Sequence, residues 1–177
     1  MKIAIIDDSA LERENGKAAV EAAGHEAIVF DPHQDLTKQH PELKSLTMMH
    51  EYDGKVTEGP LYLTINRQGM SLVDALVALK VDTVVTDLYY NLSYGGILDR
   101  RHVPSGLLTA IGMVAINIPV VICTGGNGDH HHDNDINWIY DSYALATGSV
   151  SKKIGWNDNK DWAKSVKKVI ELESQSK

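Results

Sequence analysis

Five polar residues of the kinds used in phosphoryl chemistry each follow a short run of the chain that could form a strand. Asp7 and Asp8 follow IAII, Asp87 follows TVVT, Thr124 follows VVIC and Lys152 follows GSVS. Carboxylates are the hard oxygen ligands that Mg²⁺ prefers, and a carboxylate can attack phosphorus to form an acyl phosphate. An ammonium group and a hydroxyl group can stabilise the oxygens of a transferring phosphoryl group. If the fold brings these five side chains together, they predict Mg²⁺-assisted phosphoryl transfer.

Alternating apolar and amphipathic stretches predict the elements that would position these residues. Short β-branched runs predict buried strands at residues 3–6 and 83–86, and further strands are expected at 26–30, 119–123 and 148–151. Apolar residues at helical spacing predict helices in 9–24, 71–79, 105–115, 136–145 and 158–174. Ser9 stands where it can cap the first of these helices, and Gly24 stands where that helix should end.

Strands that alternate with helices imply right-handed crossovers and a parallel sheet covered on both faces. We therefore expect an α/β, flavodoxin-like doubly wound sheet of order 2-1-3-4-5, built as a single domain over residues 1–177. In such a sheet the carboxyl ends of the strands share one edge, which would bring the five polar residues into one pocket.

Residues 33–70 interrupt this pattern and are expected to form an insert between the second strand and the second helix. Within the insert, the alternation of Leu61, Leu63 and Ile65 predicts one strand of a small hairpin, with 55–57 as its partner. A short helix is expected around 35–48.

Composition excludes several classes of function. The net charge of -7 argues against a nucleic-acid-binding surface, which would need a basic patch. No apolar run approaches the length of a membrane span, and the first residues do not resemble a signal peptide, so we expect a cytoplasmic protein. The single cysteine, Cys123, excludes an intramolecular disulfide and lies in an apolar run.

Four stretches, KIAIIDDSA, VDTVVTDLYY, IPVVICTGG and GSVSKK, follow one another in that order. Together they resemble the CheY-like receiver domains of two-component response regulators. The resemblance implies that Asp87 is the phosphoacceptor. It also implies that Asp8, assisted by Asp7, and the backbone carbonyl of Tyr89 bind Mg²⁺ together with Asp87. Thr124 and Lys152 would contact the phosphoryl group.

The function that follows from this resemblance is that of a stand-alone receiver, which is a signalling phosphoacceptor and not an enzyme. Its partners would be a histidine kinase or phosphotransfer protein and a downstream protein target, with a homodimer left open. Ser149 and Lys153 stand where the family has its switch aromatic and a proline, and the loop after Asp87 is long. These departures motivate an alternative, a receiver-like adaptor or oligomerisation module that does not depend on phosphorylation. A small Mg²⁺-dependent phosphohydrolase is the third hypothesis.

Each candidate residue also has a purely structural interpretation. Asp7 and Asp8 could stabilise the start of the first helix, Asp87 and Thr124 could be turn residues, and Lys152 could be a surface lysine. The run His130-His131-His132 contains metal-binding side chains, but consecutive side chains point in different directions, so we interpret it as a solvated loop.

Overall fold

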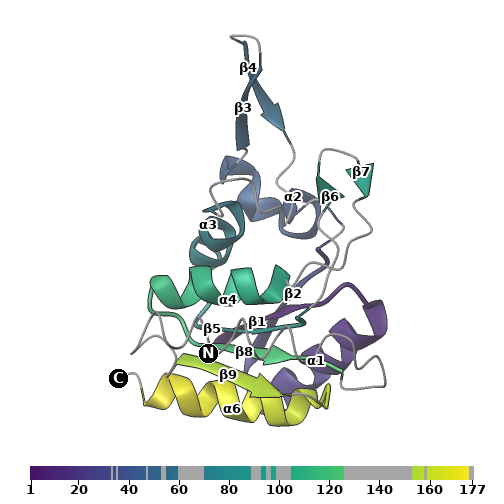
Figure 1. Ribbon diagram of the computed structural model, residues 1–177, viewed down its shortest axis with the longest axis vertical. Helices are drawn as coiled ribbons and strands as arrows, with labels where there is room; N and C mark the ends of the chain where they lie inside the picture. The colour runs from purple at the N-terminus through teal and green to yellow at the C-terminus, as the bar shows by residue number, and fades with distance from the viewer. Residues whose placement is uncertain are drawn as a thin grey trace.

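A five-stranded parallel sheet forms the centre of the computed structural model of this chain (Figure 1). The structure describes residues 1–32, 34, 36–46, 48–52, 55–59, 70–88, 93–94, 97–98, 105–125, 153–157 and 159–175. The strands of the sheet lie in the order β2-β1-β5-β8-β9. Their bounds are Lys2–Ile6 for β1, Glu26–Phe30 for β2, Thr83–Thr86 for β5, Val120–Cys123 for β8 and Ile154–Asn157 for β9. This is the order 2-1-3-4-5, and it confirms the flavodoxin-like fold class.

Two layers of helices cover the sheet, one on each face (Figure 1). Helices α1 (Ala10–Ala22) and α6 (Trp162–Ser174) pack together on one face. Helices α3 (Met70–Ala78) and α4 (Ser105–Ala115) pack on the other. Because both faces are covered, every residue of β5 and of β8 is buried, which fits the β-branched and apolar composition of these strands.

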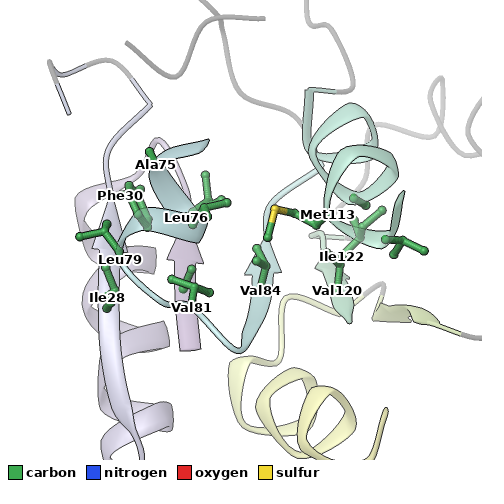
Figure 2. Packing of buried hydrophobic residues seen from close by; sticks show 14 of the residues in the cluster. Ile28, Phe30, Ala75, Leu76, Leu79, Val81, Val84, Met113, Val120 and Ile122 are labelled. Carbon is green, nitrogen blue, oxygen red and sulfur yellow. The ribbon is translucent and has the colours of Figure 1, made fainter. Parts of the chain in front are cut away.

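The hydrophobic core is divided by the sheet into two clusters. Figure 2 shows part of the larger cluster, in which Leu76 of α3 and Met113 of α4 lie against Val84 and Ile122 of the sheet. The smaller cluster lies on the opposite face. Its buried members are Ile3, Ile5, Val20, Val85, Val121, Cys123, Trp162, Val166 and Val169.

Helices α1 and α6, which pack on the face with the smaller cluster, both begin at capping residues. The Ser9 side chain accepts a hydrogen bond from the backbone N–H of Glu12 at 3.4 Å, as predicted for the start of α1. Asp161 caps α6 by accepting from the backbone N–H of Lys164 at 3.0 Å. Gly24, just beyond α1, has a φ of 78°, a left-handed conformation that favours glycine.

The prediction for the fifth strand was wrong. Residues 148–151 lie outside the described part of the chain, and the strand that pairs with β8 is β9, which begins at Ile154. Glycine is a poor strand former, but Gly155 is needed here. A Cβ atom at Gly155 would lie 2.7 Å from Cγ2 of Val121 on β8.

The insert also differs from its prediction. The helix expected around 35–48 is divided into α2 (Leu36–Gln39) and a 3₁₀ helix, η1 (Pro41–Leu46), because Pro41 cannot continue an α-helix. The hairpin pairs β3 (Met48–Tyr52) with β4 (Lys55–Gly59). The predicted partner strand around 61–65 lies outside the described residues. A second small hairpin, β6 (Ser93–Tyr94) with β7 (Ile97–Leu98), belongs to the loop after Asp87.

The helix predicted at 136–145 lies outside the described residues. Within the part of the chain that is described, every helix falls short of the length and apolarity that a membrane crossing requires.

Candidate functional site

Three carboxylates meet at the carboxyl edge of the central sheet, as predicted from their positions directly after the strands. Asp7 and Asp8 follow β1, and Asp87 follows the neighbouring strand β5, where its backbone N–H donates to the carbonyl oxygen of Ile6 at 2.8 Å. One carboxylate oxygen from each of the three lies within 4.8 Å of the others. Asp7 is completely buried, and Asp87 is 8% exposed.

Lys160 supplies the ammonium group of the site. Its Nζ lies 2.7 Å from Oδ2 of Asp7 and 2.9 Å from Oδ1 of Asp87, so one cation pairs with acids that follow two different strands. The ammonium group was expected from Lys152, which lies outside the described residues. Strand β9 follows Lys152 in the chain instead of preceding it, and the lysine beyond the carboxyl end of β9 is Lys160.

Lys153 marks the other end of the same strand. It immediately precedes β9, and its Nζ donates to the side-chain oxygen of Asn117, which lies in the turn before β8. Lys153 therefore belongs to the amino edge of the sheet, whereas the three acids lie at the carboxyl edge. It does not occupy the position after the site lysine, which is held by Asp161.

Thr124 lies beside the site and contributes its backbone to the geometry. Its N–H donates to the carbonyl oxygen of Asn157 at 2.9 Å, and its carbonyl oxygen accepts from the N–H of Lys160 at 2.8 Å. These two bonds connect the end of β8 to both sides of the turn that carries Lys160. Tyr89, expected to offer its backbone carbonyl to Mg²⁺, lies outside the described residues, as do Ser149 and His130 to His132.

Burial makes the negative charge of this site unfavourable. Desolvation raises the pKa of Asp87 from 3.8 to about 6, although the nearby charge of Lys160 lowers it. Desolvation also raises the pKa of Asp7, again against the opposing effect of Lys160. The pKa of Lys160 is raised because the attraction of Asp87 and Asp7 exceeds its own desolvation.

Arg13 of α1 supports the backbone of the acidic loop, and this role was not predicted from the sequence. Its Nη1 donates to the backbone carbonyl oxygens of Asp7 and Asp8, both at 2.9 Å. Its Nη2 lies 2.8 Å from Oδ2 of Asp31, the residue that follows β2. The guanidinium thereby connects the ends of two adjacent strands. An arginine one helical turn beyond the acids and an acid at the end of β2 are the only sequence signals of this pair.

Gly106 brings the first turn of α4 against the backbone of the phosphoacceptor candidate. Its N–H donates to the carbonyl oxygen of Leu88 at 3.0 Å. A Cβ atom at this position would lie 1.8 Å from the carbonyl oxygen of Asp87, which only a glycine can avoid. The close approach holds the first turn of α4 against the backbone of Asp87 and Leu88.

The residues present fit a hard divalent cation. Three carboxylates and one ammonium group give the cluster a formal charge of -2. The raised pKa values of Asp7 and Asp87 show that the single ammonium does not fully offset the cost of burying this charge. Mg²⁺ takes one or two carboxylates and keeps several waters, so Asp8 and Asp87, with Asp7 behind them, form a suitable donor set.

Comparisons with known proteins give matches of low identity. No protein-family model and no curated protein matches the chain. A solved structure of a response regulator receiver domain protein from Clostridium thermocellum is similar over 98% of this chain and 97% of that chain, with 14% identity and a TM-score of 0.48. The solution structure of a response regulator protein from Burkholderia multivorans is similar over 97% and 93% of the two chains, with 18% identity and a TM-score of 0.42. The fold class itself rests on the strand order and parallel register of the central sheet.

Proposed function

We propose that this chain is a receiver, in which Asp87 accepts a phosphoryl group from the phosphohistidine of a histidine kinase or phosphotransfer protein and passes the signal on by protein contact. The observation that carries the proposal is the position of Lys160. Its ammonium group lies between Asp7 and Asp87 at 2.7 and 2.9 Å, with Asp8 beside them. Carboxylate, cation and acidic metal ligands are the groups that phosphoryl transfer to an aspartate needs.

In the proposed reaction an oxygen of Asp87 attacks phosphorus while the bond from phosphorus to the histidine nitrogen breaks. The bonding electrons leave with the imidazole, and Asp87 becomes an acyl phosphate. Lys160, held beside the attacking carboxylate, would stabilise the negative charge of the phosphoryl oxygens. The Thr124 hydroxyl is the proposed hydrogen-bond donor to one of them. Mg²⁺, held by Asp7, Asp8 and Asp87, would supply further charge neutralisation when bound.

The proposal is tested by incubating the protein with acetyl phosphate and Mg²⁺ and measuring intact mass. We expect one added phosphoryl group, which hydroxylamine removes as it does from an acyl phosphate. Asp87→Asn should take up none, and EDTA should prevent labelling of the wild type. Asp74→Asn, an exposed aspartate on α3, is the matched control and should label like the wild type.

Two other outcomes would redirect the assignment. If the wild-type protein stays unlabelled in the presence of Mg²⁺, the receiver proposal is contradicted and the adaptor hypothesis is favoured. Continuous release of phosphate from a generic phosphomonoester, abolished by Asp87→Asn, would favour the phosphohydrolase, because a receiver turns over only its own acyl phosphate.

A further inference from the structure

The turn that carries Lys160 lies between the last residue of β9, Asn157, and the first residue of α6, Trp162. Lys160 has a φ of 48° in this turn. A lysine is rarely found in this left-handed region, and it stays there only where the surrounding structure holds it. The lysine side chain is long and flexible. Its Nζ can therefore remain between two carboxylates only if its backbone is kept in place.

The side chain of Asn157 makes hydrogen bonds along the whole of this turn. Its Nδ2 donates to the carbonyl oxygen of Asp161 at 2.8 Å and to Oγ of Ser165 at 2.9 Å. Its Oδ1 accepts from the backbone N–H of Asn159 at 3.1 Å. One amide group therefore binds the residue before Lys160, the residue after it and the first turn of α6.

The partners of Asn157 are themselves fixed. Ser165 is completely buried, and its Oγ also donates to the carbonyl oxygen of Asp161 at 3.0 Å. Asn159 forms an isolated bridge with Gly125, the residue after Thr124. The turn is thereby connected both to α6 and to the end of β8.

We propose that Asn157 is the positioning residue of Lys160. It sets the backbone of the turn so that the ammonium group reaches both Asp7 and Asp87. The inference deepens the proposed function, because it rests on Lys160 acting at the phosphoacceptor site. The carboxylates themselves follow β1 and β5 and lie outside this turn, so loss of the Asn157 amide should move the lysine and leave the acids in place.

The first measurement reads the lysine directly, without any phosphoryl chemistry. The ζ-ammonium signal of Lys160 is recorded by ¹⁵N NMR and assigned by its loss in Lys160→Met. In the wild type we expect slow proton exchange, because the side chain is 21% exposed and pairs with two carboxylates. Asn157→Ala should accelerate this exchange by at least about fivefold, the size expected for the net loss of even one of its three hydrogen bonds. Asn15→Ala, at an exposed asparagine of α1, should not change it.

A second variant keeps the test decisive if Asn157→Ala does not fold. Asn157→Asp has nearly the same size and keeps the oxygen that accepts from Asn159, but it cannot donate to Asp161 or Ser165. It should release the lysine in the same way. Unchanged Lys160 exchange in a folded Asn157→Asp protein would overturn the inference.

The second measurement is the rate of labelling by acetyl phosphate as a function of Mg²⁺ concentration. Asn157→Ala or Asn157→Asp should lower the rate at saturating Mg²⁺ about fivefold to tenfold and leave the half-saturating Mg²⁺ concentration unchanged. Wild-type protein that never labels, with Lys160 exchange still sensitive to Asn157, would reject the receiver and retain the positioning role. Wild-type protein that labels, with both measurements insensitive to Asn157, would reject the positioning role and retain the receiver.

Discussion

Replacing Asp87 with the isosteric asparagine should stabilise the fold at neutral pH when Mg²⁺ is absent. Burial raises the pKa of this carboxyl group from 3.8 to about 6, despite the opposing charge of Lys160. Between these two pH values the folded protein still holds the proton, whereas the unfolded chain has released it. The stability that this group contributes is therefore fully present below the lower value, and it is lost as the pH rises through about 6.

The size of the effect follows from the two pKa values. The difference between 3.8 and about 6, at about 1.4 kcal/mol for each pH unit, corresponds to about 3 kcal/mol. The side chain of Asp87 is only 11% exposed, so solvent screening reduces this figure little. Asparagine does not titrate, and Lys160 keeps its partner Asp7 at 2.7 Å in the variant. The variant should gain up to about 3 kcal/mol over the wild type between about pH 4 and about pH 7.

Urea unfolding followed by tryptophan fluorescence measures this difference, because Trp162 is buried and 4% exposed. The two proteins are compared at several pH values with EDTA present, and Asp74→Asn serves as the control, with a change within about 0.5 kcal/mol at every pH. Adding Mg²⁺ should reduce the advantage of the variant, because the ion stabilises only the folded wild type. A difference that does not vary with pH, or an Asp87→Asn protein that is less stable than the wild type at neutral pH, would refute the reasoning.

Three further substitutions test the packing and charge of the site. Gly106→Ala places a Cβ atom 1.8 Å from the carbonyl oxygen of Asp87. We expect the free energy of unfolding in urea to fall by about 1–3 kcal/mol and Mg²⁺ binding to weaken. If neither quantity changes, the close approach is contradicted. Gly16→Ala places a Cβ atom 2.7 Å from Ile5 and 2.9 Å from Trp162. The free energy of unfolding should therefore fall by about 1–3 kcal/mol, and the fluorescence emission of Trp162 should shift. A gain of about 1 kcal/mol, as helix propensity alone would give, would show that this contact is not tight. Lys160→Met removes the only ammonium group found against the acids in the described part of the chain. Mg²⁺ titration should therefore show tighter binding, and labelling by acetyl phosphate should be slower. Weaker Mg²⁺ binding would show that the lysine helps to form the metal site.

The acids and their strands could be predicted from sequence because each is a local feature. The runs before Asp7 and Asp87 are apolar and β-branched, and both end abruptly at a carboxylate. Parallel strands place such ends at one edge of a sheet, and the structure brings the two residues into contact with the same lysine. Ser9 and Gly24 were predictable for the same reason, since the end of a helix depends on a few neighbouring residues.

Lys160 could not be chosen from sequence, because the strand that precedes it carries a weak signal. Gly155 lowers the strand propensity of β9, and it is required by the packing of Val121 on the neighbouring strand. The run GSVS before Lys152 also contains a glycine, and it was preferred because GSVSKK resembles the fifth strand of receiver domains. Only the pairing of Ile154 with Val120, a contact between distant parts of the chain, establishes where the fifth strand lies.

Arg13 and Asp31 were missed for a related reason. Arg13 lies on an amphipathic helix, where a charged residue is most simply interpreted as solvent-exposed, and Asp31 resembles an ordinary turn residue before Pro32. Their 2.8 Å ion pair exists only once β1 and β2 are adjacent, and the two bonds from Arg13 to backbone carbonyls depend on how the chain turns from β1 into α1. Tertiary hydrogen bonds of this kind leave no periodic pattern in the sequence.

The position of Lys160 also changes how the departures from the receiver pattern are understood. The resemblance leads to the expectation of a proline after the site lysine, and Lys153 seemed to replace it. The residue after Lys160 is Asp161, which caps α6 and whose carbonyl oxygen accepts from Asn157 and Ser165. Proline would restrict this turn through its ring, whereas here side-chain hydrogen bonds restrict it. Each of these hydrogen bonds contributes only about 1 kcal/mol, so losing any one of them removes a large part of the restraint on the turn. The placement of the lysine should therefore be more sensitive to single substitutions in this turn than to substitutions elsewhere on α6.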